Sequence, residues 1–133
     1  MFLAFLFLNT REIIIIASIG ATAFIVFTMP GSISAQPRSV IGGHIIGILS
    51  GSVFTMGLQN WINYPLVIYS IAVGSSIFLM VATDTEHPPA SGTALGIAIN
   101  GYSTNVLIAV IASATLMALA HHFLKRYMKK LTR

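Results

Sequence analysis

Residues 39–83 read SVIGGHIIGILSGSVFTMGLQNWINYPLVIYSIAVGSSIFLMVAT, a stretch of 45 residues without one charged side chain. Two further uncharged stretches flank it, at residues 13–37 and 87–124. A bilayer core of about 30 Å needs about 20 apolar residues of helix for each crossing. The first, central and last stretches therefore have room for one, two and one crossings. This pattern predicts an all-α membrane protein with four transmembrane helices.

The composition of the chain excludes several other classes of protein. The chain has 133 residues, of which 56% are apolar and 8% charged, and its mean hydropathy is +0.88. This excludes a soluble domain and a disordered chain, and the length favours one transmembrane domain over residues 1–133. Cysteine is absent, so thiol catalysis, disulfide bonds and cysteine metal sites are excluded.

Proline and glycine mark the expected ends of the spans, which we place at residues 13–29, 38–58, 66–82 and 106–124. Between the last two spans, residues 90–99 are apolar but too short to cross a membrane. The final span is long enough alone, so we expect this short piece to be a re-entrant half-helix, buried in protein or lining a wet cavity. Similar spacings of glycine, phenylalanine and proline in the two halves allow a parallel twofold repeat.

The basic residues predict how the protein lies in the membrane. Five of the seven Lys and Arg residues fall in the last nine positions, directly after the last span. This favours a cytoplasmic C-terminus in a bacterial-type inner membrane, with the tail near anionic lipid, rather than nucleic-acid binding. With four crossings, the loops at residues 30–39 and 84–91 share the outer face. The turn at residues 59–64 then lies on the side of the tail.

Three glycines at four-residue spacing, Gly43, Gly47 and Gly51, lie on one face of the second expected span. Small residues let helix backbones approach closely, which is a main source of helix association in lipid. We expect this face to be a packing seam. Four helices leave little interior for a path, so the seam also favours a homo-oligomer.

A proline begins the helix after each outer loop, at Pro37 and at Pro88–Pro89. The first turn of a helix has free N–H groups and a positive partial charge, so two such ends facing one space favour an anion. Further donors would be Arg38, Ser39, Ser91 and Thr93. The alternative is that the prolines only begin helices and that the Arg38 side chain extends to the headgroups.

The histidines and acidic residues allow two other interpretations. Asp84, Glu86 and His87 are metal ligands or proton-relay groups by type, although three such residues on one loop cannot easily surround an ion. They are otherwise solvated loop residues. His44 lies in the uncharged stretch, where it is either a neutral packing residue or a donor to an anion or proton in a pore.

Three motifs resemble the HPP family of integral membrane proteins. They are Ser18-Ile19-Gly20-Ala21, Gln36-Pro37-Arg38-Ser39-Val40-Ile41-Gly42-Gly43-His44 and His87-Pro88-Pro89-Ala90-Ser91-Gly92-Thr93-Ala94-Leu95. The resemblance implies transport of nitrite, with which some plastid and cyanobacterial members are associated. The chain has Ala90-Ser91-Gly92 where the family pattern reads Ala-Gly-Ala.

We therefore expect a channel or carrier for a small inorganic anion, nitrite first, working as a homo-oligomer without a cofactor, a metal or enzymatic activity. If transport is coupled, the coupling ion is a proton carried by His44 or His87. The competing interpretations are a structural or assembly subunit of the membrane and, third, a membrane metalloenzyme. The expected substrate-binding residues are Arg38, Ser39, His44, His87, Pro88, Pro89, Ser91, Gly92 and Thr93.

Overall fold

The computed structural model describes residues 12–131, and the side chains of residues 12–127. In this part of the chain there are five α-helices, one short 3-10 helix and no strand. The elements are α2 (Ile13–Thr28), η2 (Ile33–Ala35), α3 (Pro37–Leu58), α4 (Pro65–Ala82), α5 (Pro89–Asn100) and α6 (Thr104–Leu131). The expected all-α class is confirmed. Three helices are long and apolar enough to cross a membrane, namely α3, α4 and α6 over Thr104–Tyr127, whereas α2 is a shorter apolar helix.

Proline and glycine fix most of the helix ends. α3, α4 and α5 each begin at a proline, whose fixed φ suits the first helical turn and whose missing N–H would have no partner there. α2 ends before Pro30, which cannot continue it. α5 ends at Gly101, whose φ of +83° lies in a region that other residues rarely adopt.

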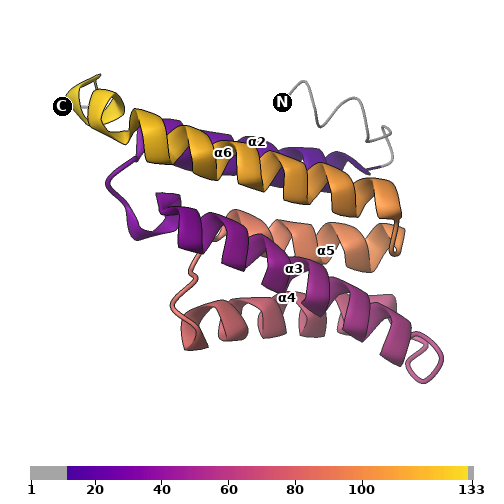
Figure 1. Cartoon of the computed structure of the whole chain (residues 1–133). Helices are drawn as coiled ribbons and strands as arrows, with labels where there is room; N and C mark the ends of the chain where they lie inside the picture. The colour runs from indigo at the N-terminus through magenta and orange to yellow at the C-terminus, as the bar shows by residue number, and fades with distance from the viewer. Residues whose placement is uncertain (1–11, 132–133) are drawn as a thin grey trace.

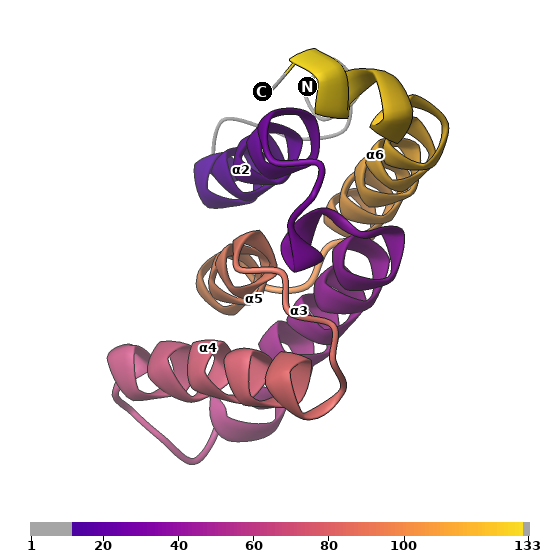
Figure 2. The ribbon, with the colours of Figure 1, turned by 90° about the vertical axis from the view of Figure 1, so that its left-hand side faces the viewer.

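The helices lie side by side and alternate in direction, and the short α5 is in the middle (Figure 1). α5 packs against α2, α3 and α4, and α6 packs against α2 and α3 (Figure 2). Seven residues of α5 are buried, including Ala90, Ala94 and Ile97. A helix enclosed in this way meets protein rather than lipid along most of its length, so it does not need the 20 residues of a lipid-exposed span.

The position of α5 changes the expected topology. The chain enters α5 at one end of the bundle and leaves it at the other (Figure 1), whereas a re-entrant half-helix returns to its own side. The basic end of α6 therefore lies beside the loop that precedes α3. His121 Nε2 donates to the carbonyl of Pro30 at 2.9 Å, and Lys125 Nζ donates to Gln36 Oε1 at 3.2 Å. The expectation that the tail shares a side with the turn at residues 59–64 is wrong.

The three glycines of α3 contact α5 and the loop before it, within the same chain. A Cβ at Gly47 would collide with the carbonyl oxygen of Ala90. A Cβ at Gly51 would lie 2.7 Å from the carbonyl oxygen of Ala94, and one at Gly43 would lie 2.7 Å from His87 Cβ. We call this contact the glycine seam. Because its partner is α5, the seam gives no argument for a second copy.

The glycine seam makes a stability prediction. Gly47→Ala should lower the thermal unfolding temperature in detergent, because a methyl group there forces two backbones apart, and overpacking of this kind costs about 1–3 kcal/mol. Gly57→Ala is the matched control, since no atom of the described residues lies within 4 Å of its Cβ position. It should be neutral or slightly stabilising through helix propensity. Equal melting of the two variants would show that the seam does not hold the helices together.

A second prediction concerns sidedness. Because the chain has no cysteine, single cysteines can be labelled cleanly in sealed vesicles. Ile33→Cys and Tyr127→Cys, both at positions 67% exposed, should react with an impermeant maleimide from the same side. Asn60→Cys, in the turn at the other end, should react only from the opposite side. Labelling of positions 60 and 127 from one side would restore the four-crossing topology.

Candidate functional site

Five buried polar side chains gather near one end of the bundle. They are His44 of α3, His87 of the loop before α5, Thr22 and Ser18 of α2, and Thr93 of α5, and none is more than 5% exposed. We call this set the histidine cluster. Ionisable residues inside a membrane domain are costly and usually mark an ion or substrate path. The histidine cluster is therefore the candidate functional site.

The Thr22 hydroxyl joins the two histidines. Thr22 Oγ1 lies 2.9 Å from His44 Nε2 and 2.9 Å from His87 Nε2. The other ring nitrogen of His87, Nδ1, donates to the carbonyl oxygen of Ser34 at 2.7 Å. Since a carbonyl can only accept, this contact fixes a proton on Nδ1 of His87.

The chain of hydrogen bonds continues from His44 to α5. His44 Nδ1 lies 3.0 Å from Thr93 Oγ1, which lies 2.9 Å from Ser18 Oγ. Ser18 Oγ in turn donates to the carbonyl oxygen of Pro89. The histidine cluster thus forms one line of six hydrogen bonds that begins at the Ser34 carbonyl and ends at the Pro89 carbonyl.

Local structure brings these side chains together. Ser18 and Thr22 are four residues apart on α2, so both lie on the face turned toward α3 and α5. The glycine seam brings α3 within reach of α5, so that His44 can meet Thr93. The missing side chain of Gly43 leaves the space that His87 Cβ occupies.

Burial favours the neutral form of His87. The pKa of His87 is lowered from its usual value, first because burial disfavours the charged ring, while the hydrogen bond to the Ser34 carbonyl opposes this shift. The rings of His44 and His87 have centroids only 5.1 Å apart, at an angle of 60°. Two protonated rings at that separation would repel each other strongly.

The structure brings together only some of the predicted site residues. His44, His87 and Thr93 are in the histidine cluster, and Pro89 supplies its end carbonyl. Arg38 is exposed, and its guanidinium donates to the carbonyl oxygen of Thr83 at 2.8 Å, tying the start of α3 to the end of α4.

The start of α5 offers fewer free donors than expected. Pro88 and Pro89 have no N–H, and the N–H groups of Ala90 and Ser91 already donate to the carbonyls of His87 and Pro88. The Ser91 hydroxyl also donates to Pro88, at 2.7 Å. Gly92 packs against α2, where a Cβ at this position would lie 3.4 Å from Ser18 Cβ.

A cavity of about 400 Å³ lies beside Arg38 and Ser39 and is also lined by Asp84 and Glu86. A smaller one, of about 220 Å³, lies beside His87, Glu86 and Met80. Among the described residues, no three His, Cys, Asp or Glu side chains come together as a metal site would require.

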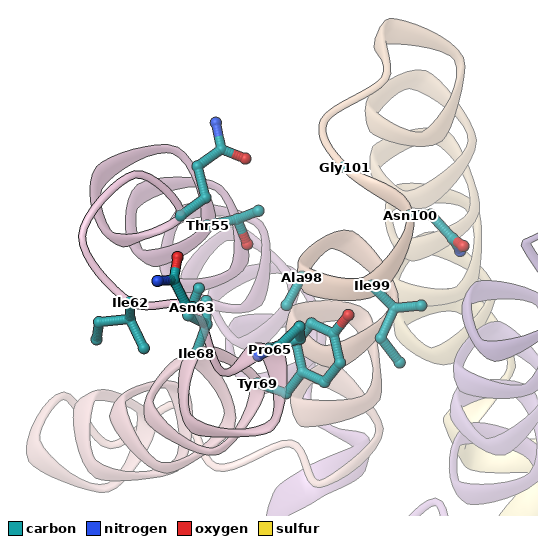
Figure 3. Close-up of a pocket in the computed structure, with 11 residues that line it drawn as sticks. Thr55, Ile62, Asn63, Pro65, Ile68, Tyr69, Ala98, Ile99, Asn100 and Gly101 are labelled. Atoms are coloured by element: carbon teal, nitrogen blue, oxygen red, sulfur yellow. The ribbon is translucent and has the colours of Figure 1, made fainter.

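A third cavity, of about 540 Å³, opens at the opposite end of the bundle. Figure 3 shows its lining, which comes from the end of α3, the following turn, the start of α4 and the end of α5. Its polar lining residues are Thr55, Gln59, Asn63, Tyr69 and Asn100.

Sequence reasoning did not single out Ser18 and Thr22 as site residues. The available signal was two hydroxyls one helical turn apart in a helix otherwise rich in isoleucine, Ile13–Thr28. That pattern marks a polar stripe on an apolar helix, although Ser and Thr in such helices often bond only to their own backbone. The Thr22 hydroxyl contacts its own helix as well as the two histidines, since it also lies 3.0 Å from the carbonyl oxygen of Ser18.

Comparison with known proteins places the chain in a family. The family model described as "HPP, transmembrane region" matches residues 1–132. One transmembrane protein of Dictyostelium discoideum is 39% identical over 88 residues, which are 66% of this chain and 31% of that protein. Another from the same organism is 35% identical over 85 residues, 64% of this chain and 27% of that protein. The chain thus spans about a third of the length of these curated relatives. No solved structure matches.

The Thr22 hydroxyl offers a test of the histidine cluster. Thr22→Val keeps the shape of the side chain but leaves two buried ring nitrogens without their partner, so stability in detergent should fall by about 1–3 kcal/mol. Thr28→Val is the control on the same helix, because the Thr28 hydroxyl is exposed and bonds to the carbonyl of Phe24 within that helix. Unfolding curves that coincide for the two variants would contradict the hydrogen bonds described here.

Proposed function

The chain belongs to the HPP family of transmembrane proteins, and from this premise we propose that it moves a small inorganic anion across the membrane, with nitrite as the first candidate. The observation that carries the proposal is the histidine cluster. Two histidines and three hydroxyls are buried together in a membrane domain, where apolar packing would be more stable and simpler. On this proposal the protein is a transporter and not an enzyme.

Two cavities support a path that leads to the histidine cluster from opposite ends. The cavity beside Arg38 lies at the end of the bundle that holds the cluster, and the cavity around Asn63 and Asn100 lies at the other. They share no lining residue, and the glycine seam between α3 and α5 lies between them. This arrangement favours a carrier that alternates its access over a pore that stays open.

Electrostatics locate the anion-binding step on this proposal. The cavity beside Arg38 also contains Asp84 and Glu86, so its own charge does not attract an anion. On this proposal the donors are the hydroxyls and ring N–H groups of the histidine cluster, and a bound anion takes the place of one of the contacts that they make with one another. Arg38, bonded to Thr83, is assigned to the entrance and to the tie between α3 and α4.

The basic end of α6 sets the proposed orientation. By the positive-inside rule, the end of the bundle that holds Lys125 and Arg38 faces the cytoplasm of a bacterial-type inner membrane. The loops beside the histidine cluster then also face the cytoplasm. We retain the homo-oligomer as part of the proposal because a bundle this small leaves α4 largely uncovered.

Anion uptake into proteoliposomes tests the proposed function. Wild-type protein should take up nitrite faster than protein-free vesicles and faster than it takes up nitrate, formate or bicarbonate. His44→Gln should slow uptake by about tenfold or more. The variant lacks the ring N–H that donates to the anion on this proposal, and the loss of one such hydrogen bond accounts for an effect of that size. Arg38→Gln should have a smaller effect. Ser76→Ala is the control, because this buried hydroxyl lies outside the histidine cluster and bonds to the carbonyl of Val73 within α4.

Wild-type uptake no faster than that of empty vesicles, for every anion tested, would favour the structural or assembly subunit. Uptake of another anion in preference to nitrite would keep the transporter and change its substrate. Full activity of His44→Gln would move the anion path away from the histidine cluster.

A further inference from the structure

The hydrogen bonds of the histidine cluster can be counted against the protons available to fill them. The line has six contacts, and each needs one proton. A hydroxyl and a neutral imidazole each supply one proton, and each can also accept a hydrogen bond. Thr22, Thr93, Ser18 and the two neutral histidines therefore supply five protons.

The shortage comes from the two ends of the line. Both ends are carbonyl oxygens, those of Ser34 and Pro89, and neither can donate. If His87 donates to Ser34 and Ser18 donates to Pro89, one contact between them has two lone pairs and no proton. Thr22 Oγ1 also lies 3.0 Å from the Ser18 carbonyl, but its one proton can go either to that carbonyl or to a ring nitrogen. This contact is therefore an alternative to one in the line and is left out of the count.

We propose that the histidine cluster is a binding site for a single proton, which is held by the His44–His87 pair and completes the line of hydrogen bonds. One added proton makes one ring an imidazolium, which donates through both nitrogens. All six contacts are then filled. Because every side chain between the two end carbonyls can both donate and accept, the protons can shift along the line and the charge can sit on either ring.

The surroundings limit the site to one proton. The ring centroids are 5.1 Å apart, so a second charge would meet the first at close range. α2 and α5 have no charged or ionisable side chain, and they contribute hydroxyls to the cluster. Other ionisable groups at this end of the bundle lie in the loops and at the ends of helices. Glu86 lines the small cavity beside His87, Arg38 and Asp84 line the neighbouring one, and His121 bonds to the carbonyl of Pro30.

Glu86 marks a route by which the proton can reach the cluster. Glu86 is exposed and lines both cavities at this end of the bundle, and His87 lines the smaller one. Two effects then oppose each other: burial disfavours a charged ring, whereas the empty contact favours it. The empty contact favours a protonated ring only while the line of hydrogen bonds is unbroken from the Ser34 carbonyl to the Pro89 carbonyl.

This inference deepens the proposed function, and only its use as a coupling step rests on that function. A carrier that binds one proton and one anion at the same place moves no net charge. Proton binding itself is measured on the purified protein without any transport. Failure of the proton site and failure of transport are therefore separate results.

The test is a titration of the histidine rings in nanodiscs by ¹⁵N NMR, with signals assigned from His44→Gln and His87→Gln. Between pH 8 and pH 4, the wild type should gain one proton on the His44–His87 pair and never two. Thr93→Val should bind that proton about tenfold more weakly or worse, a drop of about one unit or more in the midpoint. Removal of the Thr93 hydroxyl divides the line into two pieces, each with as many protons as contacts. An added proton on a ring then fills no empty contact, so its binding is less favourable.

Matched variants keep the test specific. Thr93→Ser retains the hydroxyl and should titrate as the wild type does, and so should Ser76→Ala, which loses a buried hydroxyl outside the cluster. Ser18→Ala removes one end of the line and should behave as Thr93→Val does. It replaces Thr93→Val in the test if that variant does not fold. No proton uptake above pH 4, uptake of two protons, or an unchanged midpoint in both Thr93→Val and Ser18→Ala would each overturn the proposal.

Discussion

The close approach of α3 and α5 along the glycine seam is the contact on which the rest of the structure depends. At Gly47 and Gly51 the backbone of α3 meets carbonyl oxygens of α5 directly. Lipid supplies little hydrophobic gain for helix association, so van der Waals packing at this distance is a main attraction between the helices. It also brings His44 and Thr93, far apart in the sequence, to within a hydrogen bond.

The histidine cluster is the second consequence of that approach, and it adds constraints of its own. In a membrane domain, a buried polar group without a partner costs several kcal/mol (about 2–7 by transfer scales), so the cluster positions each of its members through the others. α2 joins the bundle through Ser18 and Thr22, and the loop before α5 joins it through His87. The residues that carry the proposed chemistry therefore also hold the helices together. A substitution among them changes both the chemistry and the stability of the bundle, and both must be measured.

The sequence predicted the helical class and the family, because uncharged length, proline and glycine act locally. It did not predict that α5 runs from one end of the bundle to the other, or that the tail lies at the end opposite the turn at residues 59–64. The rule that a crossing needs about 20 apolar residues assumes contact with lipid, and α5 is enclosed by protein. Thr22 was missed because a threonine in an apolar helix shows its partners only after folding. The contact between Arg38 and the Thr83 carbonyl was not predicted either, because no local pattern connects these two residues.

The glycine seam and the histidine cluster share residues, so opening one disturbs the other. His87 fills the space at Gly43, and the His44–Thr93 contact crosses from α3 to α5 beside Gly47. Any movement that separates α3 from α5 to join the two end cavities must break that contact. On the proposed proton site, an added proton completes the line of hydrogen bonds and so favours the closed arrangement, whereas its loss leaves one contact empty and lowers the cost of separation. Proton binding and opening then influence each other reciprocally, as two linked equilibria on one element must.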